Sequence, residues 1–173
     1  ARADPKRVVY ADGEDERVLR AAQHVGDDGI ARPILIGRRD VVMRRIQKLN
    51  LRLVLERDCA LVDPEDDPRY HDYWTLYHGL MERKGVSPDY ARGLVRTRTS
   101  VIAALMVRRG EADAMLCGAV GQYHRHLKHI VDVLGLRPGA SAPAALSALI
   151  LPKGTFFLCG AYGVDDPTGP ESV

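Results

Sequence analysis

The sequence predicts an α/β fold in which helices cover both faces of a parallel sheet. Short apolar runs alternate along the chain with longer segments whose apolar residues recur at helical spacing. These helical segments are long enough to connect neighbouring parallel strands across a face of the sheet. The chain has 173 residues, of which 46% are hydrophobic, so it can bury a substantial core.

The first part of the chain supplies three of the strands. They are expected at residues 7–11, 32–37 and 59–63. A helix follows the first strand, and one of its faces is apolar, with Val18, Leu19, Ala22 and Val25. A second helix follows the strand at 32–37, and Asp40 is its expected N-cap.

A long helix comes next, capped by Asp66 or Asp67 with Pro68 near its first turn. It carries most of the aromatic residues of the chain in one stripe, which consists of Tyr70, Tyr73, Trp74, Tyr77, Leu80 and Met81. We interpret this stripe as core packing. Ser87 followed by Pro88 starts another helix, and the apolar segment 100–112 predicts a buried helix.

A further strand, buried on both faces, is expected at residues 113–120, and a helix follows it. The face that docks this helix on the sheet is predicted to consist of Leu127, Ile130, Val131 and Leu134. That docking turns four polar residues outward: His124, Arg125, Lys128 and His129.

The Pro-, Gly- and Ser-rich run at 137–143 marks a predicted domain edge. Residues 1–138 are therefore expected to form a first α/β domain. Residues 139–173 are expected to begin a second domain, with a hairpin that turns at residues 152–154, and to end before that domain is complete.

Composition and charge exclude several classes of function. The net charge of +2 is too small to indicate nucleic acid or a membrane surface as the main partner. No apolar run approaches the roughly 20 residues of a membrane span, and the amino terminus lacks the apolar core of a signal peptide. Cys59, Cys117 and Cys159 are separated and lie in apolar surroundings, which favours buried thiols in a reducing, cytoplasmic compartment. Because the chain lacks an initiator Met, we expect it to be processed or to be a piece of a longer protein.

The common phosphate, metal and nucleophile motifs are missing, among them G-x-G-x-x-G, the P-loop, H-E-x-x-H and G-x-S-x-G. Acidic residues at 14–16 crowd the start of the first helix and would repel a phosphate there. His124 and His126 point to different sides of their helix, without carboxylate or thiol partners at ligand spacing. We therefore predict no metal site.

The corner between the strand at 113–120 and the following helix is the most suggestive feature. Gly118 and Gly121 allow a tight turn or a close approach of the backbone to a ligand, and Arg125 and Lys128 follow on the helix. Open α/β sheets bind ligands at the carboxyl ends of their strands. The helix start and the two cations can hold phosphate oxygens. The alternative, a solvated basic face with two structural glycines, is equally compatible with these residues.

Several long stretches of the sequence resemble those of a known protein family. They are KRVVYADGEDERVLRAA, GIARPILIGR, DPRYHDYWTLYHGLMERKGVSPDYAR, GEADAMLCGAVGQYHRHLKHI, ALSALILPKGTFFL and the DPT near the end. The chain resembles the phosphotransacetylase (phosphate acetyl/butyryl transferase) family. More closely, it resembles the phosphotransacetylase-like domain at the carboxyl end of bacterial NADP-dependent malic enzymes.

The resemblance implies a three-layer, isocitrate dehydrogenase-like fold with a parallel or mixed sheet and a cleft between two domains. Active members of the family move acetyl between CoA and phosphate without a metal. The resemblance places Lys128 and Arg83 on the CoA or phosphate side, and the G-x-Y-x-R-x-L variant contains Gly121, Tyr123 and Arg125. Together with Gly118, these residues are the expected ligands of acetyl-CoA or phosphate.

The chain departs from the active members where they carry catalytic groups. The family's His, hydroxyl, Asp and Arg-Pro residues are replaced in the run GQYHRHLKH, and its catalytic Ser-Arg and Asp lie beyond the DPT. We therefore expect no catalytic residue in this chain. We expect a regulatory domain that binds acetyl-CoA and forms a homo-oligomer, while NADP and a divalent metal (Mg or Mn) belong to an absent malic-enzyme domain. The alternatives are an active phosphate acetyltransferase and a purely structural oligomerisation domain.

Overall fold

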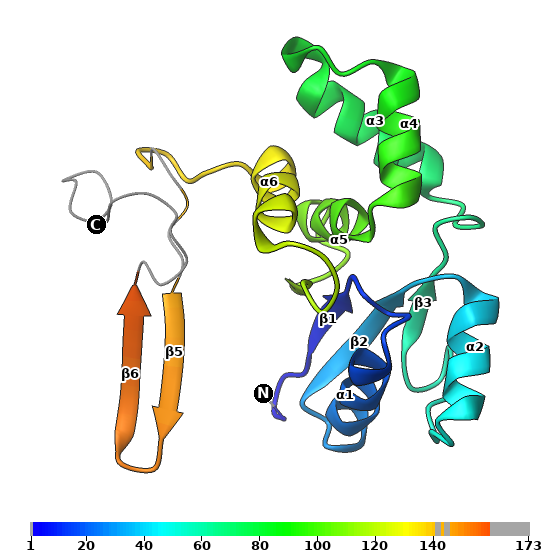
Figure 1. Ribbon diagram of the computed structural model, residues 1–173, viewed down its shortest axis with the longest axis vertical. Helices are drawn as coiled ribbons and strands as arrows, with labels where there is room; N and C mark the ends of the chain where they lie inside the picture. The colour runs from blue at the N-terminus through cyan, green and yellow to red at the C-terminus, as the bar shows by residue number, and fades with distance from the viewer. Residues whose placement is uncertain (1, 141–142, 144–145, 160–173) are drawn as a thin grey trace. The chain divides into compact units, whose positions relative to one another are not determined.

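The computed structural model describes residues 2–140, 143 and 146–159 (Figure 1). The chain divides into two compact units, residues 1–134 and residues 135–173. This division lies close to the predicted domain edge, and the assignment of 139–173 to a second domain stays a prediction. None of the helices in the described part of the chain is both long enough and apolar enough to cross a membrane.

The first unit is built on a sheet of four parallel strands, as the sequence predicts. They are β1 (Lys6–Tyr10), β2 (Ala31–Ile36), β3 (Ala60–Val62) and β4 (Ala114–Leu116). Their order in the sheet is β3-β2-β1-β4. Val9 pairs with Ile34 on one side and with Met115 on the other, so β1 is central.

Helices cover both faces of this sheet, which gives the predicted three layers (Figure 1). One face is covered by α1 (Glu16–Asp27) and α2 (Arg39–Lys48). The other is covered by α3 (Tyr70–Met81), the 3₁₀ turn η1 (Glu82–Lys84), α4 (Pro88–Thr97), α5 (Thr99–Arg108) and α6 (Tyr123–Leu134). Successive strand residues serve opposite faces: Val9 packs toward α5, whereas Tyr10 packs toward α1.

The start of α2 differs from the prediction, because Asp40 is not its cap. The helix begins after Arg38, whose side chain makes no capping bond. Instead, the amide of Arg38 donates to Glu14 (3.0 Å) and the amide of Arg39 donates to Asp63 (2.9 Å). Carboxylates from distant turns thus satisfy the first helical amides. Asp40 lies in the first turn and pairs with Arg44.

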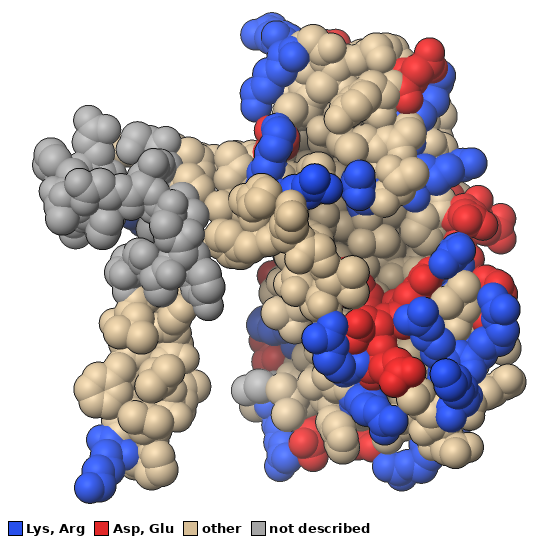
Figure 2. All heavy atoms as spheres, viewed as in Figure 1, with Lys and Arg blue, Asp and Glu red and all other residues tan. Residues whose placement is uncertain are grey.

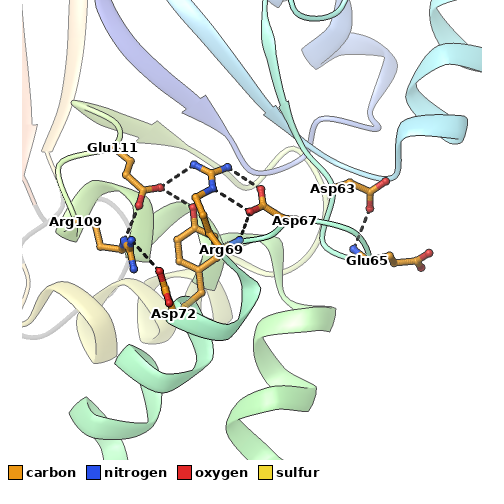
Figure 3. A network of polar contacts seen from close by, with 8 residues as sticks. Asp63, Glu65, Asp67, Arg69, Asp72, Arg109 and Glu111 are labelled. Atoms are coloured by element: carbon orange, nitrogen blue, oxygen red, sulfur yellow. Dashed lines mark hydrogen bonds and ion pairs between the residues drawn. The ribbon is translucent and has the colours of Figure 1, made fainter.

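The aromatic stripe of α3 is a core face, as predicted, with Tyr73, Tyr77 and Met81 buried. The helix begins after Arg69, whose amide donates to Asp67 (2.8 Å). A polar network links this end of α3 to the turn after α5 (Figure 3).

In that network, Glu111 accepts hydrogen bonds from the Tyr73 hydroxyl (2.6 Å) and from Arg69 (3.0 Å). Arg109 also contacts Glu111 and reaches Asp72 (3.4 Å). Burial, reinforced by the bond to Glu111, raises the pKa of Tyr73, so the hydroxyl remains a donor. The network therefore fixes the position of α3 relative to the end of α5.

The next two helices follow the prediction closely. The Ser87 hydroxyl accepts from the amide of Tyr90 (3.2 Å), and Pro88 occupies the first turn of α4. Residues 100–106 of α5 are all buried. Helix α5 is thus the central element of its layer.

Strand β4 differs from the prediction, because it is not buried on both faces. Ala114 and Leu116 are exposed, and Leu116 keeps 54% of its surface accessible. Among the described strands, β4 pairs with β1 alone, so it forms an edge of the sheet. An apolar run cannot by itself distinguish a central strand from an edge strand.

The packing face of α6 overlaps the expected one only in part, since Leu127, Ile130 and Val131 are partly buried but Leu134 is not. Val133 is its buried residue, and the partly buried His126 and His129 lie on the same side of the helix. Leu134, in the predicted docking face, is exposed. Helix α6 packs on α5, so His129 faces a neighbour where the prediction turned it outward.

The second unit contains the predicted hairpin. Strands β5 (Leu146–Leu151) and β6 (Gly154–Cys159) pair antiparallel around Pro152 and Lys153. The DPT near the end lies outside the described residues.

Candidate functional site

Five of the six predicted ligand residues lie at the corner between β4 and α6, at the carboxyl edge of the sheet. There the carboxylate of Asp12, which follows β1, accepts from the amides of Gly118 (2.9 Å) and Ala119 (3.0 Å). Arg17 donates to the carbonyl of Ala119 (2.6 Å). The amides of Gly118 and Ala119 could have bound a ligand phosphate, but they already donate to the carboxylate of Asp12.

Gly121 is required by the turn. Its φ of +101° lies in the region that favours glycine, and an added Cβ would lie 2.8 Å from Nε2 of His126. That ring nitrogen also lies 2.8 Å from the carbonyl oxygen of Val120. Gly121 therefore has a structural role in the turn, and it also lines a hollow beside the turn.

A hollow of about 580 Å³ opens beside this corner, between α4, α5 and α6. It contains three of the predicted residues, Gly121, Arg125 and Lys128. Among the lining residues that sequence analysis did not single out are Asp12, Thr97, Arg98, Thr99 and Ser100. The signal for the last four is a Thr-Arg-Thr-Ser run at the start of a buried helix.

A second hollow of about 470 Å³ adjoins the first, because Asp12, Thr97, Thr99 and Val120 line both. It lies over the carboxyl ends of β1, β2 and β3, with Ala11, Ile36 and Pro64 in its lining. The two hollows together extend along the edge of the sheet where α/β folds bind ligands.

Lys128 lines the hollow, whereas Arg83 does not. Lys128 pairs with Asp132 (2.8 Å), whose side chain is 10% exposed. Lys84 reaches the same carboxylate (3.6 Å), so Lys84, not Arg83, connects η1 to α6. Arg83 is exposed and does not line the hollow, and Tyr123 does not line it either.

Two of the three histidines of α6, His126 and His129, are partly buried, whereas His124 is exposed. Nδ1 of His126 and Nδ1 of His129 are buried and, within the described part of the chain, have no hydrogen-bond partner. Burial, with Arg98 nearby, lowers the pKa of His129. Among the described residues, no three His, Cys, Asp or Glu side chains are grouped so that they could hold a metal ion.

The corner between β1 and α1 is acidic, as the sequence indicates. Asp15 caps α1, and its hydrogen bond from Arg17 lowers its pKa to about 2. Figure 2 shows Lys and Arg side chains gathered over α2 with Asp and Glu side chains among them. Three cations of α2 and its N-cap are paired: Arg38 with Glu14 (2.9 Å), Arg39 with Glu56 (2.9 Å) and Arg44 with Asp40 (2.7 Å). Fewer unpaired cations are therefore available on this surface to bind an anion than its number of Lys and Arg residues suggests.

Comparison with known proteins gives a match over the whole chain. A family model described as Phosphate acetyl/butaryl transferase matches residues 1–173. The NADP-dependent malic enzyme of Escherichia coli (strain K12) is 46% identical over 171 residues, which cover 99% of this chain and 22% of that enzyme. The NAD-dependent malic enzyme of Rhizobium meliloti (strain 1021) is 47% identical over 169 residues, covering 98% of this chain and 22% of that enzyme. The chain thus spans 22% of the length of each relative.

The fold has a counterpart among solved structures. EutD phosphotransacetylase from Staphylococcus aureus superposes with a TM-score of 0.77 at 22% identity, covering 88% of this chain and 45% of that one. This likeness shows a shared fold.

Proposed function

Because this chain belongs to the phosphate acetyl/butyryl transferase (phosphotransacetylase) family, we propose that it is a regulatory domain that binds acetyl-CoA and does not itself catalyse acetyl transfer. The observation that carries this proposal is the hollow at the carboxyl edge of the sheet, where Gly121 and the cations Arg125 and Lys128 meet. A CoA ester carries phosphate groups, which such cations bind through charge-assisted hydrogen bonds.

The predicted residues have different parts in this proposal. Arg125 and Lys128 contact a phosphate directly, and Gly121 lets α6 begin close to the ligand. Gly118 holds the corner through its bond to Asp12. Arg83 and Tyr123 lie outside the hollow and contact more distant portions of the ester, since CoA is a long, extended ligand.

The absence of catalysis is proposed from the resemblance. The run GQYHRHLKH replaces the residues that active family members carry after the corresponding strand. We expect the 173-residue chain to release no CoA from acetyl-CoA in a phosphate-dependent way. Clear phosphate-dependent release in a coupled assay would favour the alternative, an active phosphate acetyltransferase.

The two malic-enzyme relatives support a proposal about the parent protein. We propose that it is a cytoplasmic, homo-oligomeric malic enzyme in which this domain shifts the activity when acetyl-CoA binds. NADP and a divalent metal would serve the malic-enzyme domain, and no residue of this chain is assigned to them. One relative is named NADP-dependent and the other NAD-dependent. We propose NADP because the sequence resembles the NADP-dependent enzymes.

Calorimetric titration of the chain with acetyl-CoA tests the central proposal. The double variant Arg125→Ala with Lys128→Ala should bind at least roughly tenfold more weakly, because charge-assisted contacts contribute about 1.5–3 kcal/mol each and about 1.4 kcal/mol is one decade. The matched control is Arg20→Ala with Lys48→Ala, which removes the same two charges from exposed sites on α1 and α2. The control should bind like the unmodified chain.

The mass of the assembly, measured on the same samples, distinguishes acetyl-CoA binding from the other alternative, a purely structural oligomerisation domain. If the double variant dissociates while its affinity is unchanged, the cations serve an oligomer interface and the ligand role is wrong.

A further inference from the structure

The amino-terminal end of α5 opens into the hollow without a cap. The helix has ten residues, and its N-cap is Arg98, whose side chain makes no capping hydrogen bond. The amides of Thr99 and Ser100 have no acceptor within the described residues, although Val101 and Ile102 both donate to the carbonyl of Arg98. Free amides at a helix start carry a partial positive charge and favour an anion.

Ser100 is a second and independent indication of a ligand. It is 3% exposed and lines the hollow, and no hydrogen bond joins its hydroxyl to another residue that the structure describes. Its oxygen is not one of the fully buried, unpaired side-chain atoms of the described residues, so the hydroxyl keeps access to the hollow and is available to donate to a ligand there. An acceptor placed in the hollow would satisfy it.

The wall that faces this helix start is also rich in donors. Helices α5 and α6 lie side by side (Figure 1). Arg125 and Lys128 of α6 line the same hollow, and so does His129, whose buried Nδ1 lacks a partner among the described residues. Among the described residues of the lining, Asp12 is the one acid, and its Oδ2 is already committed to two amides of the neighbouring corner.

We infer that the start of α5 is a binding subsite for a phosphate group. The amides of Thr99 and Ser100 and the Ser100 hydroxyl donate to its oxygens, while Arg98 and Arg125 supply positive charge from two sides. A phosphate group suits the place better than a carboxylate, because it offers at least three acceptor oxygens to donors that converge from different directions. The inference deepens the proposed function, since it names further residues of the same hollow. The phosphate can be free inorganic phosphate or a phosphate of a CoA ester.

An amide-resolved NMR titration of the 173-residue chain with inorganic phosphate, at constant ionic strength, tests the subsite. The amide signals of Thr99 and Ser100 should shift and saturate. The amide of Arg17 is the internal control, because it also belongs to a helix start but already donates to Asp15 (2.9 Å). It should not respond.

Two variants probe the donors separately. Ser100→Ala removes the hydroxyl and should weaken phosphate binding roughly tenfold if the bond is charge-assisted. Thr99→Pro removes one amide donor and should also weaken binding. Pro is favoured at the first helical position, and Arg98 already has the extended backbone (φ −122°, ψ 93°) that a following Pro requires. Thr75→Ala, which removes an exposed hydroxyl from α3, is the matched control for Ser100→Ala.

A parallel titration with acetyl-CoA separates the two sources of phosphate and the two proposals. If acetyl-CoA shifts the α5 amides and inorganic phosphate does not, the subsite serves the ester and the inference holds. If acetyl-CoA binds while Thr99 and Ser100 are unmoved by either compound, the proposed function stands and the subsite is wrong. If phosphate binds at α5 and acetyl-CoA does not bind at all, the subsite stands and the proposed function fails. Phosphate affinity that is unchanged in both Ser100→Ala and Thr99→Pro overturns the inference.

Discussion

The carboxylate of Asp12 accepts a hydrogen bond from the amide of Gly118 at 2.9 Å, although the two residues are 106 positions apart in the sequence. This bond joins the residue after β1 to the turn that precedes α6. The same oxygen accepts from Ala119 at 3.0 Å. The chain thus fills with its own carboxylate the place where glycine-rich turns can bind a ligand anion.

Replacing this carboxylate should change stability and affinity in opposite directions. Asp12→Asn keeps a neutral acceptor but loses the charge assistance of two bonds, so the free energy of unfolding should fall by about 1–2 kcal/mol. Phosphate affinity should rise, because a negative charge leaves the lining of the hollow. Urea unfolding and the phosphate titration measure the two effects. Asp66→Asn, at an exposed acid, should leave both unchanged, and an Asp12→Asn protein of full stability would show that the bond contributes nothing.

The hydroxyl of Tyr73 should contribute measurably to stability. It is 1% exposed and donates to Glu111 at 2.6 Å, so Tyr73→Phe leaves a carboxylate with one donor fewer in a half-buried network. We expect the free energy of unfolding to fall by about 1.5–3 kcal/mol. Tyr90→Phe, at a tyrosine that is 58% exposed, should change it by less than about 0.5 kcal/mol. If urea unfolding gives the same loss of free energy for both variants, the hydrogen bond to Glu111 does not contribute to stability.

His129 should make the stability of the chain depend on pH. Burial lowers its folded-state pKa below the ordinary value of 6.5, so the unfolded chain binds more protons near and below that pH. The folded state is therefore favoured most above pH 6.5 and loses stability as the pH falls toward the lowered pKa. Arg98, Lys128 and His126 oppose protonation, while Asp132 favours it.

Urea unfolding across this pH range gives the measurement. His129→Gln should lose less stability on acidification than the unmodified chain does, whereas His124→Gln, at an exposed position of the same helix, should behave like the unmodified chain. Parallel pH profiles for all three proteins would contradict the assignment to His129.

Cys59 should be unreactive until the chain unfolds. It is 4% exposed, and burial raises the pKa of its thiol to about 12, so little reactive thiolate is present near neutral pH. Iodoacetamide treatment followed by peptide mass spectrometry should find Cys59 unmodified in the native chain and modified in urea. Native labelling as fast as that of a free thiol would show that this end of the sheet opens readily.

The sequence by itself determined the layered fold, because burial repeats at short and characteristic intervals. The alternation of apolar strands with helices predicts the parallel sheet, and the spacing of Tyr73, Tyr77 and Met81 predicts the buried face of α3. The Ser87 cap could be predicted as well, since a cap of this kind joins residues only three positions apart.

The tertiary structure alone decided which polar groups are satisfied and which remain free. Glu14 and Asp63 displace Asp40 as the acceptors at the start of α2, and Asp12 takes the amide of Gly118. Within the described residues, the Ser100 hydroxyl has no hydrogen-bond partner beside the hollow. Periodicity reports only on neighbours within a few residues, whereas these bonds join the ends of strands and helices that meet after folding. The candidate site depends on such bonds. The sequence therefore predicts the corner between β4 and α6, but it does not predict which donors at the start of α5 remain free.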